Sequence, residues 1–135
     1  MDVRVEHRTP TVAEYQKLRA STTWVALPDD MVSKGLEHTL FGICVYVKDT
    51  VVGIGRVIGD GALYFYVQDV MVLPEFQGCG IGLLLMKEIE KYLKVHAAKN
   101  AFTGLMAADG VMDFYRKFGY ISRPDRAPGM YKMME

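Results

Sequence analysis

The spacing of apolar residues changes along the chain, and its first forty residues predict one strand and two helices. Apolar and polar residues alternate over residues 2–7, which is typical of a short strand. A capping-box pattern over residues 11–14 predicts a helix that ends near Ser21. Asp29 or Asp30 is placed to cap a second short helix. These two helices precede the main run of strands.

From Phe41 the period becomes two, and β-branched residues become frequent. Glycine and polar residues interrupt the pattern twice, and Pro74 ends it because proline cannot donate a hydrogen bond to a sheet. The region predicts three consecutive antiparallel strands, over residues 41–47, 51–58 and 62–73.

After Gly80 the apolar residues follow a helical period, with charged residues on the opposite face. This pattern predicts the longest helix of the chain, ending near Lys99 and Asn100. The remaining residues predict a strand over residues 101–107, a helix over residues 109–117 capped by Asp109 and closed by Gly119, and a last pair of short strands over residues 120–129. Together the elements predict an α+β fold in a single domain over residues 1–135.

Composition and charge exclude several classes of protein. The chain has 135 residues, half of them hydrophobic, and its 16 Lys and Arg balance its 16 Asp and Glu. A zero net charge argues against a nucleic-acid partner. No apolar run is long enough to span a membrane, and the first residues do not resemble a signal peptide, so we expect a soluble, cytoplasmic protein without a membrane partner. The two cysteines and three histidines show no metal-ligand spacing, so we expect no metal.

The strongest chemical signal is the junction at which the third strand passes through a glycine-rich loop into the long helix. The first backbone N–H groups of a helix lack internal partners and attract anions. Glycines there let a pyrophosphate approach the backbone, although they could also serve only a tight turn. The dinucleotide pattern G-x-G-x-x-G is absent, and no Walker lysine follows, which disfavours a nucleotide-binding module.

Two motifs resemble those of the GNAT superfamily of acetyl-CoA-dependent N-acetyltransferases. The first is Gln77-Gly78-Cys79-Gly80-Ile81-Gly82, and the second is the Phe-Tyr pair shortly before Gly-Tyr in residues 114–120. The order of elements also resembles that of the family over nearly the whole chain. The resemblance implies a mixed, mostly antiparallel twisted sheet with helices on both faces, acetyl-CoA as co-substrate and a small-molecule or peptide amine as acceptor.

The resemblance also implies a role for each part of the site. Backbone groups of Val70, Met71 and Val72 are expected to pair with the pantetheine arm and to polarise the thioester carbonyl, as an oxyanion hole does. Backbone N–H groups of Gln77, Gly78, Cys79, Gly80, Ile81 and Gly82 are expected to hold the pyrophosphate. Tyr115 matches the family tyrosine that protonates the departing thiolate, and Lys117 could reach the ribose phosphate.

The general base is less clear from the sequence. The positions expected to align with family bases are Tyr66 and Gln68, and neither is acidic, so a water held by Gln68 could carry the proton. Asp69 is the nearest carboxylate, but strand alternation turns it to the other face unless a bulge re-aims it, and a buried anchor is the alternative role. Tyr64 and Tyr66 are expected to border the acceptor. A non-catalytic acyl-CoA-binding module, and a possible homodimer, remain open.

Overall fold

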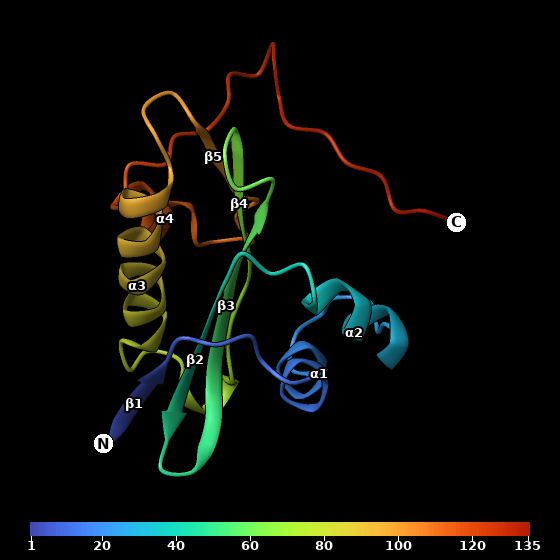
Figure 1. Ribbon diagram of the computed structural model, residues 1–135, viewed down its shortest axis with the longest axis vertical. Helices are drawn as coiled ribbons and strands as arrows, with labels where there is room; N and C mark the ends of the chain where they lie inside the picture. The colour runs from blue at the N-terminus through green and yellow to red at the C-terminus, as the bar shows by residue number, and fades with distance from the viewer. The chain divides into compact units, whose positions relative to one another are not determined.

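A five-stranded sheet in the order β1-β2-β3-β4-β5 organises the first part of the chain in the computed structural model, which describes residues 1–135 (Figure 1). Residues Met1–Leu105 and Met106–Glu135 form two compact units, and each is described separately. The strands of the first unit are β1 (Val3–Glu6), β2 (Phe41–Val47), β3 (Thr50–Gly59), β4 (Tyr64–Val72) and β5 (Phe102–Gly104). The first four strands pair antiparallel in sequence order, and β5 lies parallel to β4. The expected α+β fold with a mixed, mostly antiparallel sheet is confirmed.

Helices cover both faces of this sheet. The helices α1 (Val12–Ala20) and α2 (Asp29–Leu36) lie on one side, and the long helix α3 (Ile81–His96) lies on the other (Figure 1). The expected capping box at the start of α1 is present, with the Glu14 N–H donating to Thr11 Oγ1 at 3.1 Å. Residue Pro28 stands at the N-cap of α2 without a side-chain cap, so the expected aspartate cap is wrong; Asp29 and Asp30 are in the first turn instead.

Two glycines in β3 let α3 pack closely against the sheet. A Cβ at Gly53 would lie 2.8 Å from Ile81 Cγ2, and one at Gly55 would lie 3.0 Å from Ile89 Cδ1. Ile81, Leu85 and Ile89 are almost fully buried there. This contact fixes the start of α3 relative to the end of β4, and it gives the glycine pair a packing role. No helix is long and apolar enough to cross a membrane.

The second unit contains one short helix, α4 (Met112–Arg116). Rings of Phe114, Tyr115, Phe118 and Tyr120 contact one another edge to face. Asp109 does not cap this helix: Val111 is the N-cap, after a turn in which the Val111 N–H donates to the Ala108 carbonyl. Gly119 adopts a left-handed conformation just beyond the helix, as expected.

Three further expectations on local structure are wrong. Helix α3 ends at His96 because Ala97 adopts an extended backbone, short of the predicted end near Lys99 and Asn100. The predicted strand over residues 101–107 is reduced to β5. No strands form over residues 120–129, where the Ala127 N–H donates to the Pro124 carbonyl in a turn and proline lacks the N–H a strand needs. The expectation of a single domain stays a prediction.

Candidate active site

One edge of β4 has a strand partner only at its beginning. On its other edge β4 pairs with β3 along most of its length, from Phe65 to Val72. Towards β5, pairing covers only Tyr64, Tyr66 and the residue between them. The backbone of β4 beyond Tyr66 therefore lacks a β5 partner, and an extended ligand could pair with it as a strand does.

A β-bulge decides which backbone groups face this unpaired edge. Before the bulge, the Asp60 N–H donates to the Tyr64 carbonyl, so the even-numbered residues of β4 face β3. After it, the Leu73 N–H donates to the Val52 carbonyl at 2.8 Å, so the odd-numbered residues do. The pairing shows the change in register: Arg56 pairs with Gln68, whereas Ile54 pairs with Met71. Between these two pairs β4 has one residue more than β3.

The consequence is that the backbone groups of Val70 and Val72 turn away from β3. One of these groups already has a partner, since the Gln77 side-chain amide donates to the Val72 carbonyl at 3.0 Å. Met71 faces β3, so the expectation that residues 70–72 contact a ligand narrows to Val70 and Val72. Without the extra residue, strict alternation would direct these two towards β3 instead.

The glycine-rich loop follows directly. After a single 3-10 turn, η1 (Pro74–Phe76), the loop residues Gln77, Gly78, Cys79 and Gly80 are all exposed. Gly78 and Gly80 have left-handed φ values of 78° and 84°, which favour glycine. Gly80 is the N-cap of α3 and supplies no side-chain cap, so the N–H groups of the first turn, which includes Ile81 and Gly82, are available to an anion.

Asp69 lies in the bulge, where its backbone has a left-handed φ of 57°. Its side chain is 3% exposed and accepts two hydrogen bonds, from Tyr15 Oη at 3.0 Å and from Arg56 Nη1 at 2.8 Å. Burial and the charge of Asp69 raise the pKa of the Tyr15 hydroxyl, which stays protonated as a donor. The bulge thus turns the Asp69 side chain towards α1 and Arg56, where protein donors engage it, and this favours the anchoring role over that of a base.

The other sequence-predicted residues on β4 lie on its partly exposed face. Gln68 and Tyr66 are half-buried, and Tyr64 is exposed. Burial raises the pKa of the Tyr66 hydroxyl. The Tyr64 ring lies 6.0 Å from the ring of Phe102 on β5. Tyr66 and Gln68 therefore lie on one face of β4, the strand to which Val70 also belongs.

Tyr115 and Lys117 belong to the second unit. Tyr115 is on α4, half-buried, with its ring against those of Phe114 and Tyr120. Burial raises the pKa of the Tyr115 hydroxyl above its ordinary value near 10. Lys117 is exposed at the C-cap of α4.

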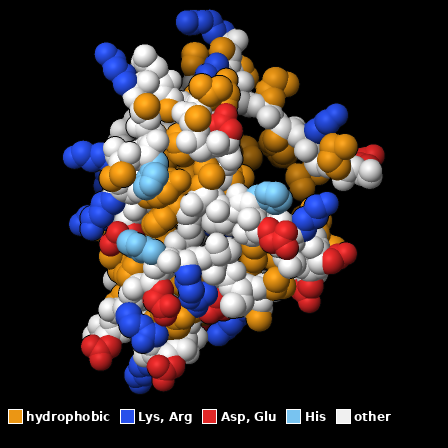
Figure 2. Space-filling view, in the orientation of Figure 1, with side chains coloured by type: hydrophobic (Ala, Val, Ile, Leu, Met, Phe, Trp, Pro, Cys, Tyr) orange, Lys and Arg blue, Asp and Glu red, His pale blue; other side chains and the backbone are white.

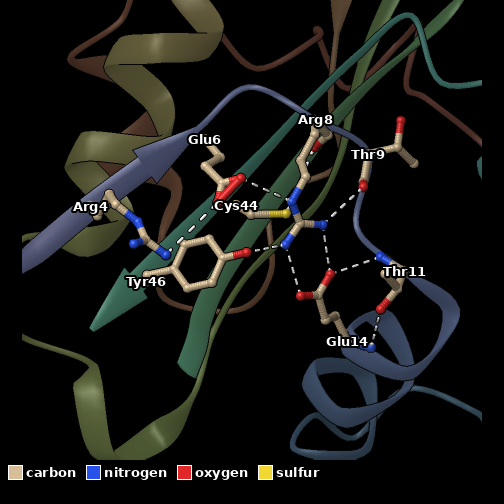
Figure 3. A network of polar contacts seen from close by, with 8 residues as sticks. All are labelled: Arg4, Glu6, Arg8, Thr9, Thr11, Glu14, Cys44 and Tyr46. Atoms are coloured by element: carbon tan, nitrogen blue, oxygen red, sulfur yellow. Dashed lines mark hydrogen bonds and ion pairs between the residues drawn. The ribbon is translucent and has the colours of Figure 1, made fainter. Parts of the chain in front are cut away.

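Sequence reasoning missed the partners of Asp69 and a second polar network. Arg56 is the only charged residue between Val51 and Ile58, in a segment that is otherwise apolar or glycine, and a lone charge there signals a buried partner. The second network centres on Arg8, which donates to both Glu14 carboxylate oxygens at 2.8 Å and also to the Tyr46 hydroxyl (Figure 3). It ties the segment after β1 to α1 and β2.

The surface carries no group of His, Cys, Asp and Glu side chains arranged to hold a metal ion. In the lower part of the face in Figure 2, acidic and basic side chains lie next to one another. Arg4 and Arg8 both pair with Glu6 in this way, at 3.8 and 3.4 Å. These two arginines are therefore paired with a carboxylate and do not form a free basic patch.

Comparison with known proteins places these features in a family. A model of the acetyltransferase (GNAT) domain matches residues 39–122, which run from just before β2 into the second unit. An uncharacterized N-acetyltransferase, ycf52, of Porphyra purpurea is 33% identical over 122 residues, which are 87% of this chain and 69% of that protein. Serotonin N-acetyltransferase 2, chloroplastic, of Oryza sativa is 30% identical over 109 residues, 76% of this chain and 52% of that protein.

Two solved structures are similar over almost the whole chain. A probable acetyltransferase from meticillin-resistant Staphylococcus aureus has a TM-score of 0.92 and 34% identity, covering 98% of this chain and 100% of that one. A GNAT family acetyltransferase from Streptococcus pneumoniae has a TM-score of 0.81 and 28% identity, covering 98% of both chains.

Proposed function

The chain belongs to the GNAT acetyltransferase family, and from that premise we propose that it transfers an acetyl group from acetyl-CoA to a primary amine. The main support for the proposal is that two possible binding features, a strand edge and a loop, follow one another along the chain. Val70 and Val72 present backbone groups at an unpaired strand edge, and the exposed loop from Gln77 to Gly80 opens α3 a few residues later. An extended amide arm followed by a pyrophosphate would match both.

Each part of the first unit has a task in this proposal. The Val70 and Val72 backbone groups bind the pantetheine arm, and an N–H of this edge donates to the thioester oxygen as negative charge develops. The loop N–H groups hold the pyrophosphate. A Cβ at Gly78 or Gly80 would meet no protein atom within 4 Å, so the space above the loop is open to a ligand.

The reaction needs no covalent enzyme intermediate. The amine nitrogen attacks the thioester carbonyl carbon, the carbon–sulfur bond breaks, and the nitrogen loses a proton. Tyr115 donates its hydroxyl proton to the departing thiolate, a role suited to a phenol because its ordinary pKa near 10 keeps it protonated at neutral pH. The proton from the amine leaves through a water held by Gln68, since the Asp69 carboxylate is already engaged by Tyr15 and Arg56.

The acceptor is proposed as a primary amine bordered by Tyr64 and Tyr66. Both side chains are on the face of β4 that is not packed in the core. Because one relative is named a serotonin N-acetyltransferase, an arylalkylamine belongs in any panel of acceptors, beside polyamines, aminoglycosides, amino acids and peptides. A cytoplasmic location and a homodimer are further proposals, which imaging of a tagged chain and sedimentation would test.

A non-catalytic acyl-CoA-binding module is the second candidate. It is favoured by the engagement of Asp69, which leaves no free carboxylate on β4, and by Ala108 at a position where the family resemblance leads one to expect an asparagine that contacts the cofactor. Calorimetry with acetyl-CoA and with ATP, followed by a thiol-release screen against the amine panel, separates the candidates. Thiol release with one class of amine supports the enzyme. Tight acetyl-CoA binding without thiol release supports the module, and equal affinity for ATP contradicts both.

A further inference from the structure

We propose that Asp69 is a positioning residue, which fixes the bulge of β4 and thereby aims the Val70 backbone at the thioester. The inference rests on the proposed function for the identity of the ligand. It assigns to a buried carboxylate a task other than proton transfer, and it extends that task to two residues outside β4, Tyr15 and Arg56.

The first step is that each oxygen of the Asp69 carboxylate accepts a hydrogen bond from a protein donor. Tyr15 on α1 donates to Oδ1 and Arg56 on β3 donates to Oδ2. Arg56 is 8% exposed and Asp69 3%, so the pair is shielded from water. A buried carboxylate whose two oxygens accept from an arginine and a tyrosine is turned towards protein donors and away from an incoming amine, which suits an anchor better than a base.

The second step is that this anchor sits at a strained position of the backbone. Aspartate tolerates a left-handed φ better than most residues, but such a conformation persists only where surrounding contacts hold it. The two hydrogen bonds come from two different elements, α1 and β3, which both precede β4 in the chain. They hold Asp69 in place, and Asp69 lies where the backbone groups of β4 that face β3 change from the even-numbered to the odd-numbered residues.

The third step is that the anchor is tied to the early helices. Arg56 also donates to the Gly35 carbonyl on α2 at 2.9 Å and to Thr39 Oγ1 at 3.0 Å. The Tyr15 hydroxyl accepts from Arg19 Nη1 at 3.0 Å, and Arg19 Nε donates to the Val25 carbonyl between the two helices. One carboxylate therefore links the two early helices, α1 and α2, with the strand proposed to hold the acetyl group.

The test compares two variants of Asp69 that tolerate the left-handed backbone. Asp69→Gly keeps the conformational freedom but removes the anchor, and Asp69→Asn keeps the shape but cannot accept from both donors. In each, kcat is expected to fall about tenfold or more, as when an oxyanion donor is misplaced, with the Kd for acetyl-CoA changed less than about threefold because the loop is intact. Tyr15→Phe is expected to have a smaller effect in the same direction.

The matched control is Asp60→Asn. Asp60 accepts from the N–H groups of Ala62, Leu63 and Tyr64 in the turn before β4, so it stabilises the same strand without touching the bulge. Its kcat is expected to stay within about twofold of the unaltered protein, because a general loosening of the strand is not the proposed cause.

A spectroscopic measurement distinguishes a misplaced Val70 backbone from a general loss of protein stability. The unaltered protein is expected to shift the carbonyl ¹³C resonance of a bound ketone analogue of acetyl-CoA downfield, and Asp69→Gly is expected to return it towards the free value. A folded Asp69→Gly or Asp69→Asn with an unchanged carbonyl resonance overturns the inference. This measurement needs only binding of the analogue, so it tests the role of Asp69 even if no amine is acetylated. A failure to acetylate any amine would contradict the proposed function and not the role of Asp69.

Discussion

The ion pair between Arg8 and Glu14 gives a prediction about acid stability. Both carboxylate oxygens accept from Arg8, and Oε1 also accepts from the Thr11 N–H in the capping box (Figure 3). The hydrogen bonds from Arg8 are the main cause that lowers the pKa of Glu14 from 4.5 to about 2. The side chains are 29% and 23% exposed, so the pair is only partly screened by water.

Replacing Glu14 with glutamine removes the charge and keeps the cap, since glutamine also serves at this position of a capping box. The full pKa shift would correspond to about 3 kcal/mol, and screening by solvent reduces this to about 1–2 kcal/mol. We therefore expect Glu14→Gln to lower the free energy of unfolding by about 1–2 kcal/mol at pH 7.

The sign of the pH dependence follows from the lowered pKa. The stabilisation is complete above the unfolded-state pKa of about 4.5 and is lost as pH falls towards the folded-state pKa of about 2. The difference between the unaltered protein and Glu14→Gln, measured by urea unfolding with circular dichroism, should accordingly shrink by more than half between pH 7 and pH 3. Glu6→Gln is the matched control, because Glu6 also contacts Arg8 but is 41% exposed, and a change below about 0.5 kcal/mol is expected. A pH-independent difference for Glu14→Gln would refute the reasoning.

Three further substitutions test the site. Tyr115→Phe is expected to lower single-turnover rates about tenfold or more with little change in acetyl-CoA affinity; an unchanged rate would remove Tyr115 as proton donor. Gly82→Val, where α3 already has helical geometry, is expected to weaken acetyl-CoA binding about tenfold or more in calorimetry without loss of helix stability, and wild-type affinity would argue against the loop as the pyrophosphate site. Gly80→Ala is expected to cost about 1 kcal/mol of unfolding free energy because of its left-handed φ, and no loss in urea unfolding would contradict that conformation.

Features set by neighbouring residues could be predicted from the sequence. The capping box of Thr11 and Glu14 depends on four consecutive residues, and the loop from Gln77 to Gly80 depends on glycines that are required locally. These elements need no information from distant parts of the chain.

Features set by distant residues could not be predicted in the same way. The bulge at Asp69 depends on Tyr15 and Arg56, which are 54 and 13 residues away along the chain. Asp109 is a good capping residue by type, but the turn at Gly110 moves the start of α4 beyond its reach. The residue type of Asp109 therefore favours a helix cap, but the turn decides where α4 begins, and Asp109 does not cap it.

We propose that the protein transfers an acetyl group and that backbone N–H groups form its anion site. The most direct measurement incubates the protein with acetyl-CoA carrying a deuterated acetyl group and with the amine panel, and it quantifies labelled amide by mass spectrometry beside free CoA thiol. We expect labelled amide and thiol in equal amounts for one class of amine, and a loss of both in Tyr115→Phe. Acetyl-CoA that binds but yields no labelled amide with any amine would contradict the proposal.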